Sequence, residues 1–142
     1  MPKLLFKIGA SQDVPPPKFG PAFARLSAWP YRLEMALAFL GLLVVLFYWR
    51  LFVVGDLDVP VTVFWLLWPD LLAFIPIGLA MRKTTTWPSW GPVLYNIPHS
   101  FLVWLAVFAV WSLVAGAIVW PLLGWAAHIS VDRATGYYLR AR

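Results

Sequence analysis

The feature that most constrains this chain is a run of 31 residues, Phe101–Val131, without a single Asp, Glu, Lys or Arg. A membrane-spanning helix needs about 20 apolar residues, so this run is too long for one crossing. Gly116, followed by Pro121, marks a break and predicts a tight hairpin near Ala115–Val119. Hydrophobic residues make up 62% of the 142 residues, against roughly one half in soluble domains. The chain is therefore expected to be an integral membrane protein.

Four spans account for most of the length, because four crossings of about 20 residues use about 80 residues and leave the remainder for tails and loops. The expected spans are residues 33–54, 59–81, 93–115 and 120–139. Pro69 and Pro76 fall inside the second span and are expected to interrupt it. The predicted fold class is all-α, an integral membrane four-helix bundle that occupies residues 31–142.

Residues 1–30 differ from the rest of the chain in composition. They combine a Pro-rich stretch with basic residues: Pro15, Pro16, Pro17, Lys3, Lys7, Lys18 and Arg25. Proline has no N–H and disrupts helices, so this segment is predicted to be an extended, basic, cytoplasmic tail. Its apolar start is far shorter than the hydrophobic core of a signal peptide, so the first span is expected to act as its own signal.

The basic residues predict the orientation of the spans. With both termini in the cytoplasm, ten of the eleven Lys and Arg residues lie on the cytoplasmic side, and Arg50 alone lies outside. Cytoplasmic loops carry such an excess of basic residues. The net charge of +5 is therefore interpreted as a topology signal. We expect a multi-pass protein of a bacterial inner membrane, cytoplasmic or intracytoplasmic, whose partners are lipids and other integral membrane subunits, not nucleic acid.

Any chemistry must come from polar side chains within the spans, because burying such groups in hydrocarbon costs free energy. The chain contains no cysteine, which excludes disulfides and thiolate sites. The predicted polar intramembrane cluster consists of Glu34, Asp70, Asn96, His99, His128, Asp132 and Arg133.

The two histidines and Asp132 predict a metal or proton site. His128 and Asp132 are four residues apart and share one helical face. At about 1.5 Å per residue from the hairpin, His99 and Asp132 lie at one level and His128 lies about 6 Å nearer the outer side. Imidazole and carboxylate groups suit a divalent ion, with Glu34 or Asp70 as a base.

A purely structural interpretation competes with this site. Asp132 would accept a hydrogen bond from His99 or His128, and Arg133 would extend to a lipid phosphate. Such contacts are worth about 0.6–2 kcal/mol in membranes.

Ligation of haem or (bacterio)chlorophyll by His128 is a third possibility. Gly124 precedes it by four residues and could lie beneath a planar ring. The axial offset of about 9 Å expected between His99 and His128 argues against a bis-histidine haem.

Three motifs carry a resemblance to a known family. They are Trp68-Pro69-Asp70, the segment Tyr95–Ser100 with its Tyr-Asn-x-x-His pattern, and the closing segment His128–Leu139. Over about residues 31–140 the chain resembles a small bacterial membrane family, domain-of-unknown-function family four-two-six-zero, whose members look like four-helix proteins. Tyr138 stands where the family pattern has a second glycine. The resemblance implies that the polar residues of these motifs act together as one group, but it implies no activity.

Two functions from different classes remain open. The first is a structural or accessory subunit of a larger membrane complex, of photosynthetic reaction-centre, light-harvesting or respiratory type by analogy. Ten Trp, ten Phe and five Tyr would then make intramembrane contacts. The tail would dock on a partner through Lys18, Phe19, Phe23 and Arg25.

The alternative is an intramembrane metal-dependent hydrolase or proton-handling protein that uses the His/Asp cluster. The low specificity of the motifs favours the first, a non-enzymatic role without a cofactor.

Overall fold

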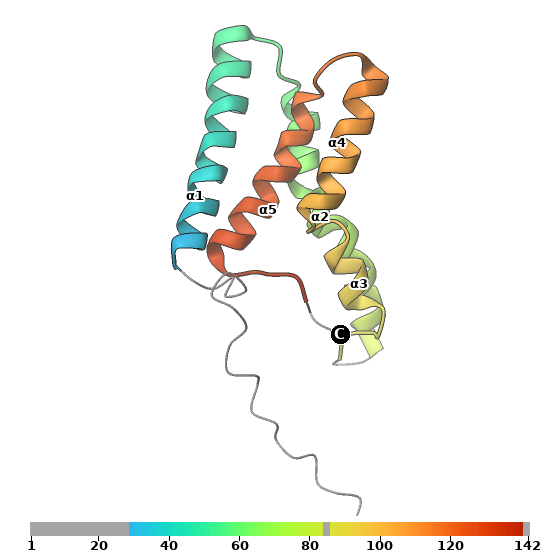
Figure 1. The fold of residues 1–142 in the computed structure, drawn as a ribbon. Coiled ribbons are helices and arrows are strands. Elements are labelled where there is room, and N and C mark those ends of the chain that lie inside the picture. The colour runs from blue at the N-terminus through green and yellow to red at the C-terminus, as the bar shows by residue number, and fades with distance from the viewer. Residues whose placement is uncertain (1–28, 84–85, 141–142) are drawn as a thin grey trace, which may run out of the picture.

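The computed structural model describes residues 29–83 and 86–140, and this part of the chain is all-helical (Figure 1). The elements are α1 (Trp29–Leu43), η2 (Val44–Val54), α2 (Val59–Ala80), η3 (Met81–Lys83), α3 (Gly91–Asn96), α4 (Phe101–Ala115), η4 (Trp120–Leu122) and α5 (Leu123–Thr135). The predicted tail and its docking residues Lys18, Phe19, Phe23 and Arg25 lie outside the described residues.

α1 and η2 form one continuous apolar helix, and η2 is wound as a π-helix. The helix begins at Trp29, four residues before the expected start, because Pro30 is tolerated in a first turn. It ends at Gly55, whose φ of 77° closes the last turn with a bond of 2.9 Å to the Arg50 carbonyl. Arg50 forms an ion pair with Asp56.

α2 matches the second expected span to within one residue. Asp58 caps it by accepting a 3.1 Å hydrogen bond from the Val61 N–H, and Pro60 occupies the first turn. The expected interruptions are wrong, because the helix continues through Pro69 and Pro76. A proline removes one helical N–H, and packing against neighbouring helices can compensate for that loss.

The third expected span, 93–115, is wrong as a continuous helix. It is divided into α3 and α4 by a turn over Ile97–Ser100. Pro98 contributes to the break because it has no N–H to continue the helical hydrogen bonding, and the backbone becomes extended at Ser100, with φ −99° and ψ 123°. The hairpin after α4 is confirmed: Gly116 has a φ of 66°, and Ala117 N–H donates to the Ser112 carbonyl at 3.2 Å.

The fourth helical segment, η4 with α5, ends at Thr135 and not at 139. Gly136 adopts a φ of 101°, a left-handed conformation that ends the helix. Arg32 of α1 donates to the exposed carbonyl oxygens of Ala134 and Thr135 at 2.8 and 3.0 Å. The first and last helices are thus joined at this end of the molecule.

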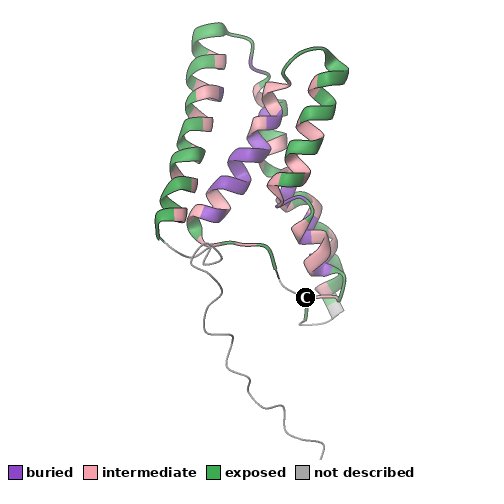
Figure 2. Cartoon of the chain, in the orientation of Figure 1, coloured by how far each residue is buried: buried purple, intermediate pink, exposed green. Residues whose placement is uncertain are grey.

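The helices run up and down, so the α1–α2 and α4–α5 connections lie at one end (Figure 1). The start of α1 and the end of α5 lie at the opposite end. α5 is the central helix, packed mainly against α1 and α2, and residues 124–130 are all buried (Figure 2). Leu122, Trp125 and Ile129 form the core there, with Trp65 stacked on Trp125.

Two helices of the described chain, Trp29–Val54 and Val59–Ala80, are long and apolar enough to span a membrane. α4 is apolar but shorter. Large apolar side chains are exposed along α1, η2, α2 and α4, whereas several polar side chains are buried. The described structure therefore places much apolar surface outside and polar groups inside.

Candidate metal centre

Four side chains from three parts of the chain converge at one point. Asp70 comes from α2, His99 from the turn before α4, and His128 and Asp132 from α5. The Nε2 atom of His99 lies 3.5 Å from Asp70 Oδ1 and 3.5 Å from Asp132 Oδ2. The Nε2 atom of His128 lies 3.6 and 3.5 Å from the same two oxygens. Each ring nitrogen therefore faces both carboxylates.

The turn over Ile97–Ser100 holds His99 in place. Its Nδ1 lies 2.7 Å from the Tyr95 carbonyl oxygen, and its ring stacks on the Tyr95 ring at 4.0 Å between centroids. Arg133 donates to the His99 carbonyl at 2.9 Å, and Trp125 donates to the Pro98 carbonyl. The break in the third helix thus leaves the Pro98 and His99 carbonyls free to accept hydrogen bonds from two side chains of α5, and these bonds hold the turn in place.

His128 is placed by a close crossing of α2 and α5. A Cβ atom at Gly124 would lie 2.6 Å from the Thr62 carbonyl oxygen, so only glycine permits this approach. His128 lies one turn beyond Gly124 on α5, and the Leu66 backbone nitrogen would lie 3.2 Å from a Cβ at Gly124. The same face of α2 continues to Asp70, which brings this carboxylate to the imidazole.

The hydrogen bonding defines what the two rings present to the centre. A carbonyl oxygen can only accept, so His99 Nδ1 carries the proton and Nε2 of the neutral ring has a lone pair. Both Nε2 atoms are buried, and no described residue hydrogen-bonds them. The side chains of His99 and His128 are only 2% and 9% exposed. Two imidazole nitrogens and two carboxylate oxygens thus face one another.

The centre has a closed and an open side. The Asp132 side chain is 20% exposed and that of Asp70 is 49% exposed. Both line a pocket of about 230 Å³ whose other walls are Phe74, Tyr95 and Tyr137. The histidines therefore form the buried side of the centre and the carboxylates form the side reached from the pocket.

Asp70, His99 and His128 form a group that could hold a metal ion, since one ligand atom from each lies within 4.8 Å of the others. Asp132 Oδ2 is as near to both histidines as Asp70 is. The sequence predicted His99, His128 and Asp132 as ligands, and all three meet here. Asp70 was expected only as a base, although it lies as close to both imidazoles as Asp132 does.

The other members of the predicted cluster have different positions. Asn96 forms two hydrogen bonds with the backbone of Arg140, at 2.8 and 2.7 Å. Arg133 is buried and bonds the His99 carbonyl, so the expected extension to lipid phosphate is wrong. Glu34 is exposed on α1, and no described contact joins it to the centre.

The expected difference in depth between the histidines is also wrong. Their ring centroids lie 5.4 Å apart. Counting along straight helices fails because the turn at 97–100 breaks the third helix. The position considered for a macrocycle at Gly124 is filled by the backbone of Thr62 and Leu66, so no planar ring can lie there.

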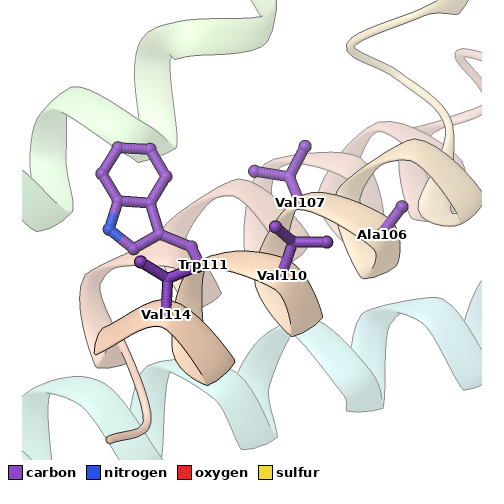
Figure 3. Close-up of a pocket in the computed structure, with 5 residues that line it drawn as sticks. All are labelled: Ala106, Val107, Val110, Trp111 and Val114. Atoms are coloured by element: carbon purple, nitrogen blue, oxygen red, sulfur yellow. The ribbon is translucent and has the colours of Figure 1, made fainter. Parts of the chain in front are cut away.

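A second and larger hollow lies on α4 (Figure 3). It measures about 430 Å³ and is lined by Ala106, Val107, Val110, Trp111 and Val114. None of these side chains titrates, so this hollow offers apolar contact but no catalytic group.

No protein-family model, curated protein or solved structure matches this chain. The resemblance to the four-helix family therefore stays a prediction. Neither the comparisons nor the described contacts support a link to photosynthesis or electron transport. The candidate site rests on its own geometry.

Proposed function

We propose that this chain is a multi-pass membrane protein that binds a divalent metal ion of the zinc type through Asp70, His99, His128 and Asp132. The observation that carries the proposal is the set of four nitrogen–oxygen separations, which all fall between 3.5 and 3.6 Å. Ligand atoms placed tetrahedrally at about 2.0–2.2 Å around one zinc ion lie about 3.3–3.6 Å from one another. These four nitrogen–oxygen separations are therefore as long as the edges of a zinc tetrahedron, and Asp70, His99 and His128 form the set whose ligand atoms all lie within 4.8 Å of one another.

Protonated histidines account for this geometry less well. An imidazolium that donates to a carboxylate has a nitrogen–oxygen distance of about 2.7–2.9 Å. Each Nε2 instead lies midway between two oxygens, at a distance too long for such a bond. One shared cation satisfies all four groups, because it accepts lone pairs from both nitrogens and both oxygens.

The ligand types favour a borderline metal over a hard one. Calcium and magnesium are held by six or more oxygen ligands, whereas two imidazoles and two carboxylates suit zinc and similar transition ions. The His99 imidazole also has the second interaction that is typical of metal-binding histidines, with the Tyr95 carbonyl.

The distribution of polarity supports a membrane location. In lipid, ionisable side chains face the bundle interior and apolar ones face outward. Here His99, His128 and Arg133 are buried, while Leu102 and Leu113 are largely exposed. We infer four crossings of an inner membrane with both termini cytoplasmic, in agreement with the distribution of Lys and Arg.

Metal analysis of the full chain, purified in mild detergent, tests the proposal. We expect about one zinc per chain, lost in His99→Ala and His128→Ala and reduced in Asp132→Ala. Glu34→Gln is the matched control, because Glu34 is an exposed carboxylate on α1 and its substitution should retain the metal. A metal-free wild-type protein that does not take up added zinc would refute the metal site.

An accessory-subunit role is a second candidate, favoured by the aromatic surface of η2. Tyr48, Trp49 and Phe52 are at least half exposed on one helix, which suits contact with another membrane subunit as well as with lipid. Copurification of stoichiometric partners from native membranes would support this role. Loss of those partners in Phe52→Ala, with the metal retained, would separate it from metal binding.

A further inference from the structure

We propose that the bound ion accepts a fifth ligand from the pocket beside Asp70, and that this ligand is a small oxygen-donor anion. This inference rests on the proposed metal site. It gives the centre an exchangeable ligand, bound by expansion to five-coordination, which zinc can adopt.

The first argument is the unequal exposure of the four ligands. The histidine side chains are at least nine-tenths buried, whereas the Asp70 side chain is half exposed. A closed structural site buries all of its ligands alike. In this centre, an external ligand can reach the ion only past the carboxylates of Asp70 and Asp132, which is where the pocket lies.

The second argument is the shape and lining of the pocket. Its volume of about 230 Å³ is below the range of about 300–1,000 Å³ that is usual for drug-sized ligands. Phe74, Tyr95 and Tyr137 form its walls, and its two carboxylates are those of Asp70 and Asp132. The pocket therefore fits a compact molecule whose polar end points at the ion.

The third argument is the charge at the pocket wall. The Arg140 guanidinium lies 5.4 Å from the centre of the Tyr95 ring and 4.4 Å from that of Trp87. Asn96 holds the Arg140 backbone through two hydrogen bonds, and the guanidinium lies over the ring of Tyr95, one of the pocket walls. Two carboxylates already neutralise a divalent ion, so the additional positive charge of Arg140 favours an anionic external ligand.

Cobalt substitution tests the inference, because the visible spectrum of Co²⁺ reports its coordination number. The full chain is loaded with Co²⁺ in detergent and titrated with acetohydroxamate, a compact ligand with two oxygen donors. We expect a saturable fall in the intensity of the visible bands as the ion gains a ligand. Arg140→Gln should weaken acetohydroxamate about threefold to tenfold and still retain Co²⁺.

Arg82→Gln is the matched control, since Arg82 is an exposed arginine of η3 outside the pocket, and it should bind acetohydroxamate as the wild type does. Failure to bind Co²⁺ at all would overturn both the metal site and this inference. Tight Co²⁺ binding with a spectrum that acetohydroxamate leaves unchanged would overturn only the fifth ligand. Equal affinities in Arg140→Gln and Arg82→Gln would overturn the assignment of the anion to this pocket.

Discussion

α5 and the α1–η2 helix differ in a way that their sequences do not suggest. α5 contains His128, Asp132 and Arg133, yet seven consecutive residues of it are buried. The α1–η2 helix is far more apolar, yet no residue of α1 is buried and Leu46 is the one buried residue of η2. The more polar helix therefore forms the centre of the molecule and the more apolar helix lies at its edge.

This arrangement is the reverse of a soluble protein, where apolar side chains leave water for the core. Lipid tails are as apolar as leucine, so a surrounding bilayer provides no such force between apolar helices. Polar side chains must instead find partners inside the protein. In the membrane location proposed above, polar contacts and close packing would add to the apolar core of Leu122, Trp125 and Ile129 in holding α5 at the centre.

Gly124→Ala should have the largest effect, because its new Cβ would collide with the backbone oxygen of Thr62. Overpacking of this kind costs about 3 kcal/mol or more when backbone must move. We expect a lower midpoint of thermal unfolding in detergent and loss of bound metal. Gly78→Ala is the control, since a Cβ there meets nothing within 4 Å, and it should be neutral or stabilising. Similar behaviour of the two variants would contradict the close α2–α5 crossing.

Ile129→Ala compared with Phe52→Ala tests the contrast between the two helices directly. Ile129 on α5 is fully buried, so its truncation leaves a cavity and should cost about 2–4 kcal/mol. Phe52 on η2 is 77% exposed, and its truncation should cost less than about 0.5 kcal/mol. Unfolding by a graded series of denaturing detergent measures both. A larger loss for Phe52→Ala would show that η2 is covered by protein.

Arg133→Met should have an intermediate effect on stability and a clear effect on metal binding. The substitution preserves the apolar stem but removes the donor to the His99 carbonyl, which costs about 1–3 kcal/mol. Because this bond helps to hold the turn that carries His99, zinc affinity should fall about 10- to 100-fold. Competition with a chelator measures the affinity, with Arg82→Met as the control. Unchanged affinity would mean that the turn holds its shape without Arg133.

Asn96→Ala should have the smallest effect on the whole protein. Its two hydrogen bonds to the Arg140 backbone are exposed, so their loss should cost about 1 kcal/mol or less. The change should be local and appear as faster amide hydrogen exchange at residues 136–140. Exchange that spreads into α5 would indicate that this segment stabilises the central helix.

Much of the helical framework follows from local signals in the sequence. Gly116 ends α4 as predicted, and Gly55, Asp58 and Pro60 also lie at helix ends, because capping and left-handed turns depend on neighbouring residues. His99, His128 and Asp132 were also identified from the sequence as candidate ligands, since ionisable residues are rare in such apolar segments.

The tertiary structure decided which of these residues meet. Sequence counting placed His99 and His128 at different depths, because it assumed straight, parallel helices. The turn at Pro98 and the glycine-mediated crossing at Gly124 bring the two rings together. In the same packing, Arg133 and Asn96 hydrogen-bond with backbone groups, and Asp70 lies beside the histidines of the metal centre. Composition and periodicity describe one helix at a time, whereas the contacts between helices depend on packing of residues far apart in the chain.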